Sequence, residues 1–405
     1  MAIDLLVSGI DTLLTMDSDA GETALGVVPD GAVAFAAGRV AWVGPSAEAP
    51  PAREVRDGHG CIGMPGLVDC HTHAVWAGSR ADEFRRRLAG ERYSDILAAG
   101  GGILSTVRAT RAATEEDLVA DAARRLATMA AKGVTTVEVK SGYGLAPEAE
   151  ARLLRAARAA GELAGVRVVT TFLGAHAVPA EHRADRAGYL REVIEVQLPA
   201  CAPFADYVDV YVDEGAFTVE EGRAVLESGR RHGLLPRIHA EQVAATGAAA
   251  MAASLGASSA DHLERVDAAG IAAMAAAGTV AVLLPGAMLY LRDAAPPVAA
   301  LREAGVPLAV ATDLNPGTSP VADLWACATL ACVTMGLTVE EALLGITRNA
   351  ARALGRHDLG RLRPGAAGDF VLVRPPAGEP PEAAPLVQFL GALEVALRVH
   401  EGKAT

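Results

Sequence analysis

The sequence has few aromatic residues and no long hydrophobic run, and each absence excludes a class of protein. Aromatic residues make up 4% of the chain and hydrophobic residues 51%, so the core must consist mainly of Ala, Val and Leu. No apolar run reaches the roughly 20 residues of a transmembrane helix. The N-terminus also lacks the basic region and apolar stretch of a secretory signal. We therefore expect a soluble, cytoplasmic protein.

Positive charge and paired cysteines are scarce as well. The chain has 36 Lys and Arg residues against 49 Asp and Glu residues, a net charge of -13, which argues against binding to nucleic acid or to an anionic membrane. Its cysteines are odd in number and form no C-x-x-C motif, which favours reduced, mostly buried thiols over a disulfide framework. These cysteines are Cys61, Cys70, Cys201, Cys327 and Cys332.

Apolar runs alternate with Ala-, Leu- and Arg-rich helical stretches from about Gly66 to Pro320. Parallel strands that are buried on both faces are typically continuous apolar runs of this kind. Eight β/α repeats over about 250 residues predict an α/β fold, a (β/α)8 TIM-like barrel. The eight runs are Gly66–Cys70, Val134–Lys140, Val166–Leu173, Tyr207–Val212, Leu234–Ile238, Ser258–Asp261, Thr279–Leu284 and Pro307–Thr312.

The two ends of the chain have a different pattern. Residues 1–62 contain short strand-like pieces with turn signals, and Gly368–Val373 has the same character. We expect residues 1–62 and 363–405 to form one small β-sandwich domain, and residues 63–362 to form the barrel. The length of 405 residues suits one large domain and a smaller one.

His71 and His73 follow the first apolar run with a spacing of two residues, so on a strand they point to the same side. His239 and Asp313 follow later runs, at the carboxyl end of the barrel where such folds keep their active sites. Three imidazoles and a carboxylate predict an open catalytic metal site rather than a closed structural one. Any one of these residues alone is better explained as a hydrogen-bonded core residue. The whole set at successive strand ends is better explained as a metal site.

Lys140 raises the alternative of a two-metal site, because a carbamylated lysine bridges two metals in some barrels. It lies at the end of the second run, however, and the fourth run ends in Asp213 and Glu214 with no lysine. We therefore expect one divalent metal per chain, zinc or iron.

Polar residues near the predicted metal site can contact a substrate. Arg80 can bind a carboxylate bidentately, although a surface salt bridge is an equally good explanation from charge statistics alone. Tyr143 lies in a glycine-hinged loop that can present its hydroxyl group. The loop after Asp313 supplies the amide of Asn315 and the hydroxyl of Thr318.

Several segments together resemble the imidazolonepropionases of the amidohydrolase superfamily. They are His71–Arg80, Gly100–Val107, Val139–Leu145, Phe172–His176 and Asp313–Thr318. The resemblance covers nearly the whole chain. It implies hydrolysis of the cyclic amide of 4-imidazolone-5-propanoate to N-formimidoyl-L-glutamate in histidine degradation, with attack of a metal-activated hydroxide on the ring carbonyl.

The resemblance also implies a role for each matching residue. The metal would be bound by His71, His73, His239 and Asp313. His262 would polarise the ring carbonyl, and Asp313 would move the proton to the leaving nitrogen. Substrate contacts would come from Arg80, Tyr143, His176, Gln242, Asn315, Gly317 and Thr318.

Gln242 departs from the pattern of some relatives, which have a carboxylate at this position. An amide can orient the substrate ring and so take part in catalysis, but it cannot act as a base. Glu241 is adjacent and should face away from the site at a strand end.

Two other functions remain open at this point. The nearest is a mononuclear amidohydrolase that deaminates a cytosine- or guanine-like ring, which would have little use for Arg80. A catalytically inactive scaffold is less favoured, because all the metal ligands are present. We expect a small-molecule substrate with a carboxylate arm and, from the Ala-rich outer helices, a homodimer.

Overall fold

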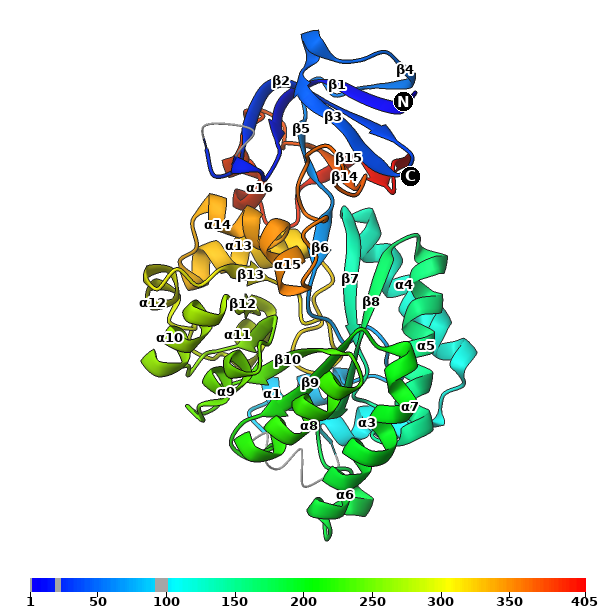
Figure 1. Cartoon of the computed structure of the whole chain (residues 1–405), viewed down its shortest axis with the longest axis vertical. Coiled ribbons are helices and arrows are strands. Elements are labelled where there is room, and N and C mark those ends of the chain that lie inside the picture. The colour runs from blue at the N-terminus through cyan, green and yellow to red at the C-terminus, as the bar shows by residue number, and fades with distance from the viewer. Residues whose placement is uncertain (1, 19–22, 92–100) are drawn as a thin grey trace.

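The computed structural model describes residues 2–18, 23–91 and 101–405, so that Gly100, the first residue of one family segment, lies outside the described residues. Two parts are visible in Figure 1. Strands and helices from the middle of the chain form the larger, lower part, and strands from both chain ends form a separate sheet above it.

The larger part is built on eight strands in sequential order, and every neighbouring pair is parallel. The observed strands overlap all eight predicted runs, and the prediction of a TIM-like barrel is confirmed. The strands are β6 (Leu67–Asp69), β7 (Val134–Lys140), β8 (Arg167–Ala175), β9 (Tyr207–Val212), β10 (Leu235–Ala240), β11 (Ser259–His262), β12 (Val280–Leu283) and β13 (Leu308–Val310).

The last strand meets the first just beyond their regular segments. Thr72 and Leu314 form an isolated parallel bridge. The N–H of Asp313 donates to the carbonyl of His71 at 3.0 Å, and the N–H of His73 donates to the carbonyl of Leu314 at 2.9 Å. These bonds connect the two segments that carry three of the predicted metal ligands.

Helices cover the outside of the barrel, as Figure 1 shows for α4 and α5 beside β7 and β8. Within the described ranges, none of the helices is long and apolar enough to cross a lipid bilayer. The helices are α1 (Ala81–Leu88), α3 (Ile103–Ala112), α4 (Glu115–Ala131), α5 (Pro147–Ala164), α6 (Arg186–Glu192), α7 (Leu198–Cys201), α8 (Val219–Arg231), α9 (Ala248–Ser254), α10 (Ala268–Ala277), α11 (Pro285–Leu291), α12 (Val298–Glu303), α13 (Leu324–Met335), α14 (Val339–Gly345), α15 (Arg348–Ala353) and α16 (Ala383–Gln388).

Helix α4 shows how local sequence sets these boundaries. The Thr114 side chain caps the helix by accepting the N–H of Asp117, and its hydroxyl donates to the Asp117 carboxylate. The apolar stripe that begins at Leu118 is buried, and Gly133 follows the helix with a φ of 93°. The stripe therefore fixes which face of the helix packs on the barrel.

The separate sheet joins the two chain ends, since β14 pairs with β5 and β5 pairs with β1. The chain passes from this sheet to the barrel at Gly66, where a Cβ atom would lie 2.4 Å from Thr135 Oγ1. We propose the domain boundary there, slightly after residue 62. The strands are β1 (Ile3–Leu14), β2 (Val27–Ala36), β3 (Arg39–Pro45), β4 (Ala52–Asp57), β5 (Ile62–Pro65), β14 (Phe370–Arg374), β15 (Glu394–His400) and β16 (Lys403–Ala404).

Candidate active site

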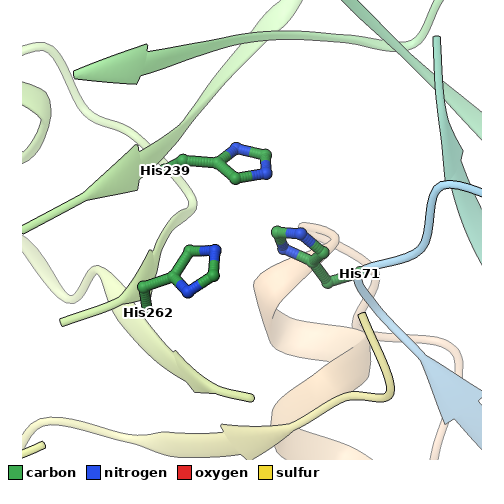
Figure 2. A group of neighbouring side chains, drawn as sticks. All are labelled: His71, His239 and His262. Carbon is green, nitrogen blue, oxygen red and sulfur yellow. The ribbon is translucent and has the colours of Figure 1, made fainter. Parts of the chain in front are cut away.

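Histidines from distant parts of the chain meet at the carboxyl end of the barrel. Figure 2 shows His71, His239 and His262 projecting toward one another from the ends of β6, β10 and β11. Ligand atoms of these three residues lie within 4.8 Å of one another, and so do those of His71, His73 and Asp313. The two groups share His71 and form one cluster.

The spacing within this cluster fits a single metal ion. His71 Nε2 and His73 Nε2 each lie 3.5 Å from Asp313 Oδ1, and His73 Nε2 lies 3.4 Å from His239 Nε2. Ligands bonded at about 2.1 Å to a tetrahedral zinc lie about 3.4 Å from one another. These distances leave room for one ion beside His71, His73 and Asp313, with His239 next to His73.

Protonation of the cluster also fits a metal. Burial lowers the pKa of His71 and of His73 well below the usual range, so both are neutral imidazoles with a free lone pair. Burial raises the pKa of Asp313 well above its usual range. Among the described residues, buried His71 Nε2 has no hydrogen-bond partner. Neutral imidazoles beside a buried carboxyl group are a donor set that suits a divalent metal.

Two of the histidines are oriented by buried carboxylates. His71 Nδ1 lies 2.7 Å from Asp261 Oδ2, and His239 Nδ1 lies 3.0 Å from Asp209 Oδ2. A carboxylate on Nδ1 fixes the tautomer that leaves Nε2 as the ligand atom. His71 and His239 are thus held in the orientation that metal binding requires.

The backbone at the site is strained. Asp313 has a φ of 50° and His262 a φ of 80°, both in the left-handed region that non-glycine residues rarely adopt. Such residues cost about 1–3 kcal/mol each and persist where the surrounding structure imposes them. This backbone conformation directs the two side chains toward the cluster, just after β13 and at the end of β11.

A cavity of about 770 Å³ opens over the cluster, within the range of small-molecule sites. His71 does not line this cavity and is fully buried. Every other residue that the sequence assigned to the site lines the cavity: His73, Arg80, Tyr143, His176, His239, Gln242, His262, Asp313, Asn315, Gly317 and Thr318.

Arg80 lies on the cavity wall, and its side chain is only 11% exposed, which excludes a surface salt bridge. Its Nη2 lies 2.6 Å from Glu83 Oε2, and its Nη1 lies 3.5 Å from Thr106 Oγ1. A Cβ atom at Gly317 would lie 2.9 Å from Arg80 Nη1. Glycine at position 317 therefore leaves space beside the guanidinium group.

A buried carboxylate shapes the loop of Tyr143. Glu150 accepts the backbone N–H groups of Gly142, Gly144 and Leu145 at 2.8, 2.7 and 2.6 Å. Burial raises the pKa of the Tyr143 phenol, which keeps it protonated. The loop thus presents a neutral hydroxyl group to the cavity.

His176 is held by the same loop. Its Nδ1 lies 3.0 Å from the Gly142 carbonyl and therefore donates to it, which leaves Nε2 as an acceptor. The ring stacks on His73 with centroids 5.1 Å apart, and burial lowers the pKa of His176 to about 3. His176 offers the cavity a neutral acceptor.

The Asn315 amide is occupied within its own loop. Its Nδ2 donates to the carbonyl of Asp313 at 2.7 Å, and its Oδ1 accepts the N–H groups of Gly317 and Thr318 at 2.9 and 2.7 Å. Asn315 therefore shapes the loop that places Asp313, Gly317 and Thr318.

Gln242 is positioned by Tyr211, whose hydroxyl lies 3.3 Å from Gln242 Oε1. Glu241 takes no part in lining the cavity, and its Oε1 accepts the N–H of Gly247 at 2.7 Å. The adjacent carboxylate thus faces away from the cavity, as its place at a strand end suggested.

Sequence reasoning missed several polar residues on or near the cavity wall. Arg186 and Asp293 line the cavity, and each is held by an ion pair, to Glu221 and to Arg265 respectively. Glu264 Oε2 lies 3.9 Å from His262 Nδ1, and burial raises the pKa of Glu264 to about 8. The proximity of Glu264 to His262 in sequence was the only available signal.

The sequence is similar to those of known proteins. A model of the Amidohydrolase family matches residues 62–404. The chain is 50% identical to an imidazolonepropionase of Cupriavidus pinatubonensis over 383 residues, 93% of this chain and 89% of the relative. It is 52% identical to an imidazolonepropionase of Stenotrophomonas maltophilia over 379 residues, 92% of this chain and 91% of the relative.

More distant solved structures share the fold. An adenosine deaminase from Xanthomonas campestris with bound zinc is 20% identical and has a TM-score of 0.72, with 99% of this chain and 92% of that chain covered. Atrazine chlorohydrolase from Arthrobacter aurescens, solved with zinc, is 17% identical with a TM-score of 0.71, covering 99% and 94%. The chain belongs to the amidohydrolase family and, within it, to the imidazolonepropionases.

Proposed function

We propose that this chain hydrolyses the cyclic amide of 4-imidazolone-5-propanoate to N-formimidoyl-L-glutamate, a step of histidine degradation. The observation that carries the proposal is Arg80, whose side chain is only 11% exposed, on the wall of a cavity that also exposes His239 and Asp313. The substrate has a propanoate for the guanidinium group and a cyclic amide for the donor cluster. The imidazolonepropionase relatives support the same reaction.

We propose that His71, His73, His239 and Asp313 bind one zinc or iron ion. When bound, the ion supplies a Lewis acid and an activated water near neutral pH. His71 and His239 have carboxylates on Nδ1, as metal-binding histidines usually do, whereas the carboxylate nearest to His262 Nδ1 is 3.9 Å away. His73 Nδ1 also has no hydrogen-bond partner among the described residues, so His73 is assigned to the metal by its 3.5 Å distance to Asp313. His262 is assigned to the substrate by the resemblance to the imidazolonepropionases.

Lys140 supports the choice of one metal rather than two. Its Nζ lies 2.9 Å from Glu138 Oε1 and 2.8 Å from Asp209 Oδ2. Burial opposes the charge of Lys140, but Asp209 and Glu138 outweigh it and raise the pKa of the ammonium group. A protonated, ion-paired amine is not available for carbamylation.

The residues around the cavity bind and orient the substrate. Arg80 and the hydroxyl of Tyr143 hold the propanoate, while His176 accepts a hydrogen bond from the ring. Gln242, held by Tyr211 through its Oε1, directs its Nε2 to the ring. The ring carbonyl then lies over the donor cluster.

His262 stabilises the charge that develops on the carbonyl oxygen, and Asp313 transfers the proton. Burial lowers the pKa of His262 to about 3, so it is a neutral imidazole that donates one N–H to the ring carbonyl oxygen. Asp313 takes a proton from the attacking water and delivers it to the ring nitrogen. The bond between the carbonyl carbon and that nitrogen breaks, and the carbonyl becomes the new carboxylate.

The proposal is tested by following the ultraviolet absorbance of freshly prepared imidazolonepropanoate. We expect the metal-replete protein to remove the ring absorbance and form formimidoylglutamate, and a chelator-stripped sample to do neither until zinc or iron is restored. Metal analysis of the replete protein should give one ion per chain. A chain that holds one ion but leaves the ring intact would contradict the proposed substrate.

Replacing Arg80 with alanine tests the carboxylate arm. Charge-assisted hydrogen bonds contribute about 1.5–3 kcal/mol, so we expect Arg80→Ala to raise KM about 10- to 100-fold. Arg85→Ala is the matched control, because Arg85 lies on α1 with its side chain 80% exposed. An unchanged KM for Arg80→Ala would favour a deaminase of a ring without a carboxylate.

The five cysteines are unpaired thiols in the described structure, which is typical of a reducing compartment and supports a cytoplasmic location. The homodimer stays a prediction. Apolar side chains on the outer helices, such as Leu163 and Val333, are 71% and 77% exposed and are available for such an interface. Sedimentation of the purified chain measures its oligomeric state.

A further inference from the structure

The carboxylates that orient the two histidines come from different strands. Asp209 lies on β9 and serves His239, which lies on β10. Asp261 lies on β11 and serves His71, which follows β6 on the far side of the barrel. The two orienting pairs therefore have no strand in common.

Lys140 connects these two pairs from a third place, the end of β7. Its Nζ lies 2.8 Å from Asp209 Oδ2 and 3.8 Å from Asp261 Oδ2. The same oxygen atom, Asp209 Oδ2, lies 3.0 Å from His239 Nδ1, and Asp261 Oδ2 lies 2.7 Å from His71 Nδ1. The Lys140 ammonium group is thus connected to each histidine through one carboxylate.

This network lies in the barrel interior, away from water. The side chains of Glu138, Lys140, Asp209, Arg237 and Asp261 are all 0% exposed. Three carboxylates face two cations, so removal of one cation leaves two uncompensated buried charges. A buried charge without an oppositely charged partner destabilises the fold.

Arg237 does not duplicate the role of Lys140. Its Nη2 lies 3.2 Å from Asp261 Oδ2 and donates to the carbonyl of Cys70 at 2.6 Å. Within the ion pairs of the described residues, Lys140 is the cation that reaches both Asp209 and Asp261.

We propose that Lys140 is a positioning residue for the metal site. It holds Asp209 and Asp261 together against their mutual repulsion, so that His239 and His71 present Nε2 to the same point. The inference rests on the metal site of the proposed function but not on the identity of the substrate. It assigns to Lys140 a role that requires the free ammonium group.

The test is the metal affinity of Lys140→Met, which removes the charge and keeps a long side chain. Partners in the second coordination shell typically change metal affinity about 10- to 100-fold, and we expect a loss in this range. Zinc affinity is measured by competition with a chromophoric chelator. The absorption spectrum of the cobalt-substituted protein reports the ligand geometry, and we expect its visible bands to shift.

Arg398→Met is the matched control. Arg398 is a buried cation whose Nε donates to the carbonyl of Val134, at the opposite end of the same strand β7. It should leave zinc affinity and the cobalt spectrum unchanged. Far-UV circular dichroism of the metal-free variants checks that each is folded, and Lys140→Gln replaces Lys140→Met if the latter does not fold.

The outcomes separate this inference from the proposed function. Zinc affinity within threefold of the unmodified chain in the folded Lys140 variant overturns the inference, and so does an equal loss in Arg398→Met. Failure of the unmodified chain to bind zinc or cobalt would instead overturn the metal site itself. Tight metal binding without turnover of imidazolonepropanoate would overturn the substrate and leave the role of Lys140 intact.

Discussion

Replacing His239 with alanine is expected to lower kcat/KM by about 10³-fold or more and to release the metal. A bound metal contributes several kcal/mol to the transition state, and each 1.4 kcal/mol is worth a factor of ten in rate. His239 Nε2 lies 3.4 Å from His73 Nε2, and Asp209 orients the ring through His239 Nδ1. Its loss removes one ligand and one of the two partners of the buried Asp209 carboxylate, which keeps its ion pair to Lys140, and the missing ligand weakens metal binding.

The measurement is metal content after gel filtration, together with the rate of ring absorbance loss. His232→Ala is the control, since His232 caps the C-terminus of α8 and is exposed. We expect this control to keep its metal and its rate. A His239→Ala protein that retains one ion per chain and full activity would remove His239 from the ligand set and bring His262 into it.

The barrel could be predicted from the sequence because its strands are buried on both faces. Continuous apolar runs such as Val134–Lys140 and Tyr207–Val212 match the observed strands residue for residue. Strand ends were less certain, and β8 extends to Ala175 where the apolar run suggested Leu173. Hydrogen bonding to the neighbouring strand, which no local pattern records, determines the last residues.

The residues that line the cavity were predictable because they follow strands at one end of the barrel. The buried network beneath them was not recognised. Glu138, Asp209 and Arg237 each lie inside an otherwise apolar run, and Asp261 ends the short run Ser258–Asp261. A charged residue within a strand that is buried on both faces needs a partner, and this was the available signal. Which partner it has depends on three-dimensional contacts between strands that are distant in sequence.

Closure of the barrel and assembly of the site involve the same segments. The hydrogen bonds from Asp313 to His71 and from His73 to Leu314 join the last strand to the first. The donor cluster therefore forms only when the barrel closes. We infer that metal binding stabilises this junction. An ion that binds the folded chain but not the unfolded chain shifts the folding equilibrium toward the folded state.

Replacing Asp313 with asparagine is expected to lower kcat about 10²- to 10⁴-fold, the usual contribution of general acid–base catalysis. Asparagine has nearly the same shape but cannot accept a proton from water. Burial raises the pKa of Asp313, whereas a bound cation would favour its ionised form. The ionised form is the one that can take the proton.

This variant separates two roles of Asp313, as a ligand and as a proton carrier. The rate is measured with zinc titrated to saturation, so that a weaker ligand is still occupied. Asp267→Asn is the control, because Asp267 caps α10 through Gly270 N and asparagine caps helices equally well. If saturating metal restores the rate of Asp313→Asn, Asp313 is only a ligand and another group carries the proton. If the rate stays low with the site filled, the proton passes through Asp313.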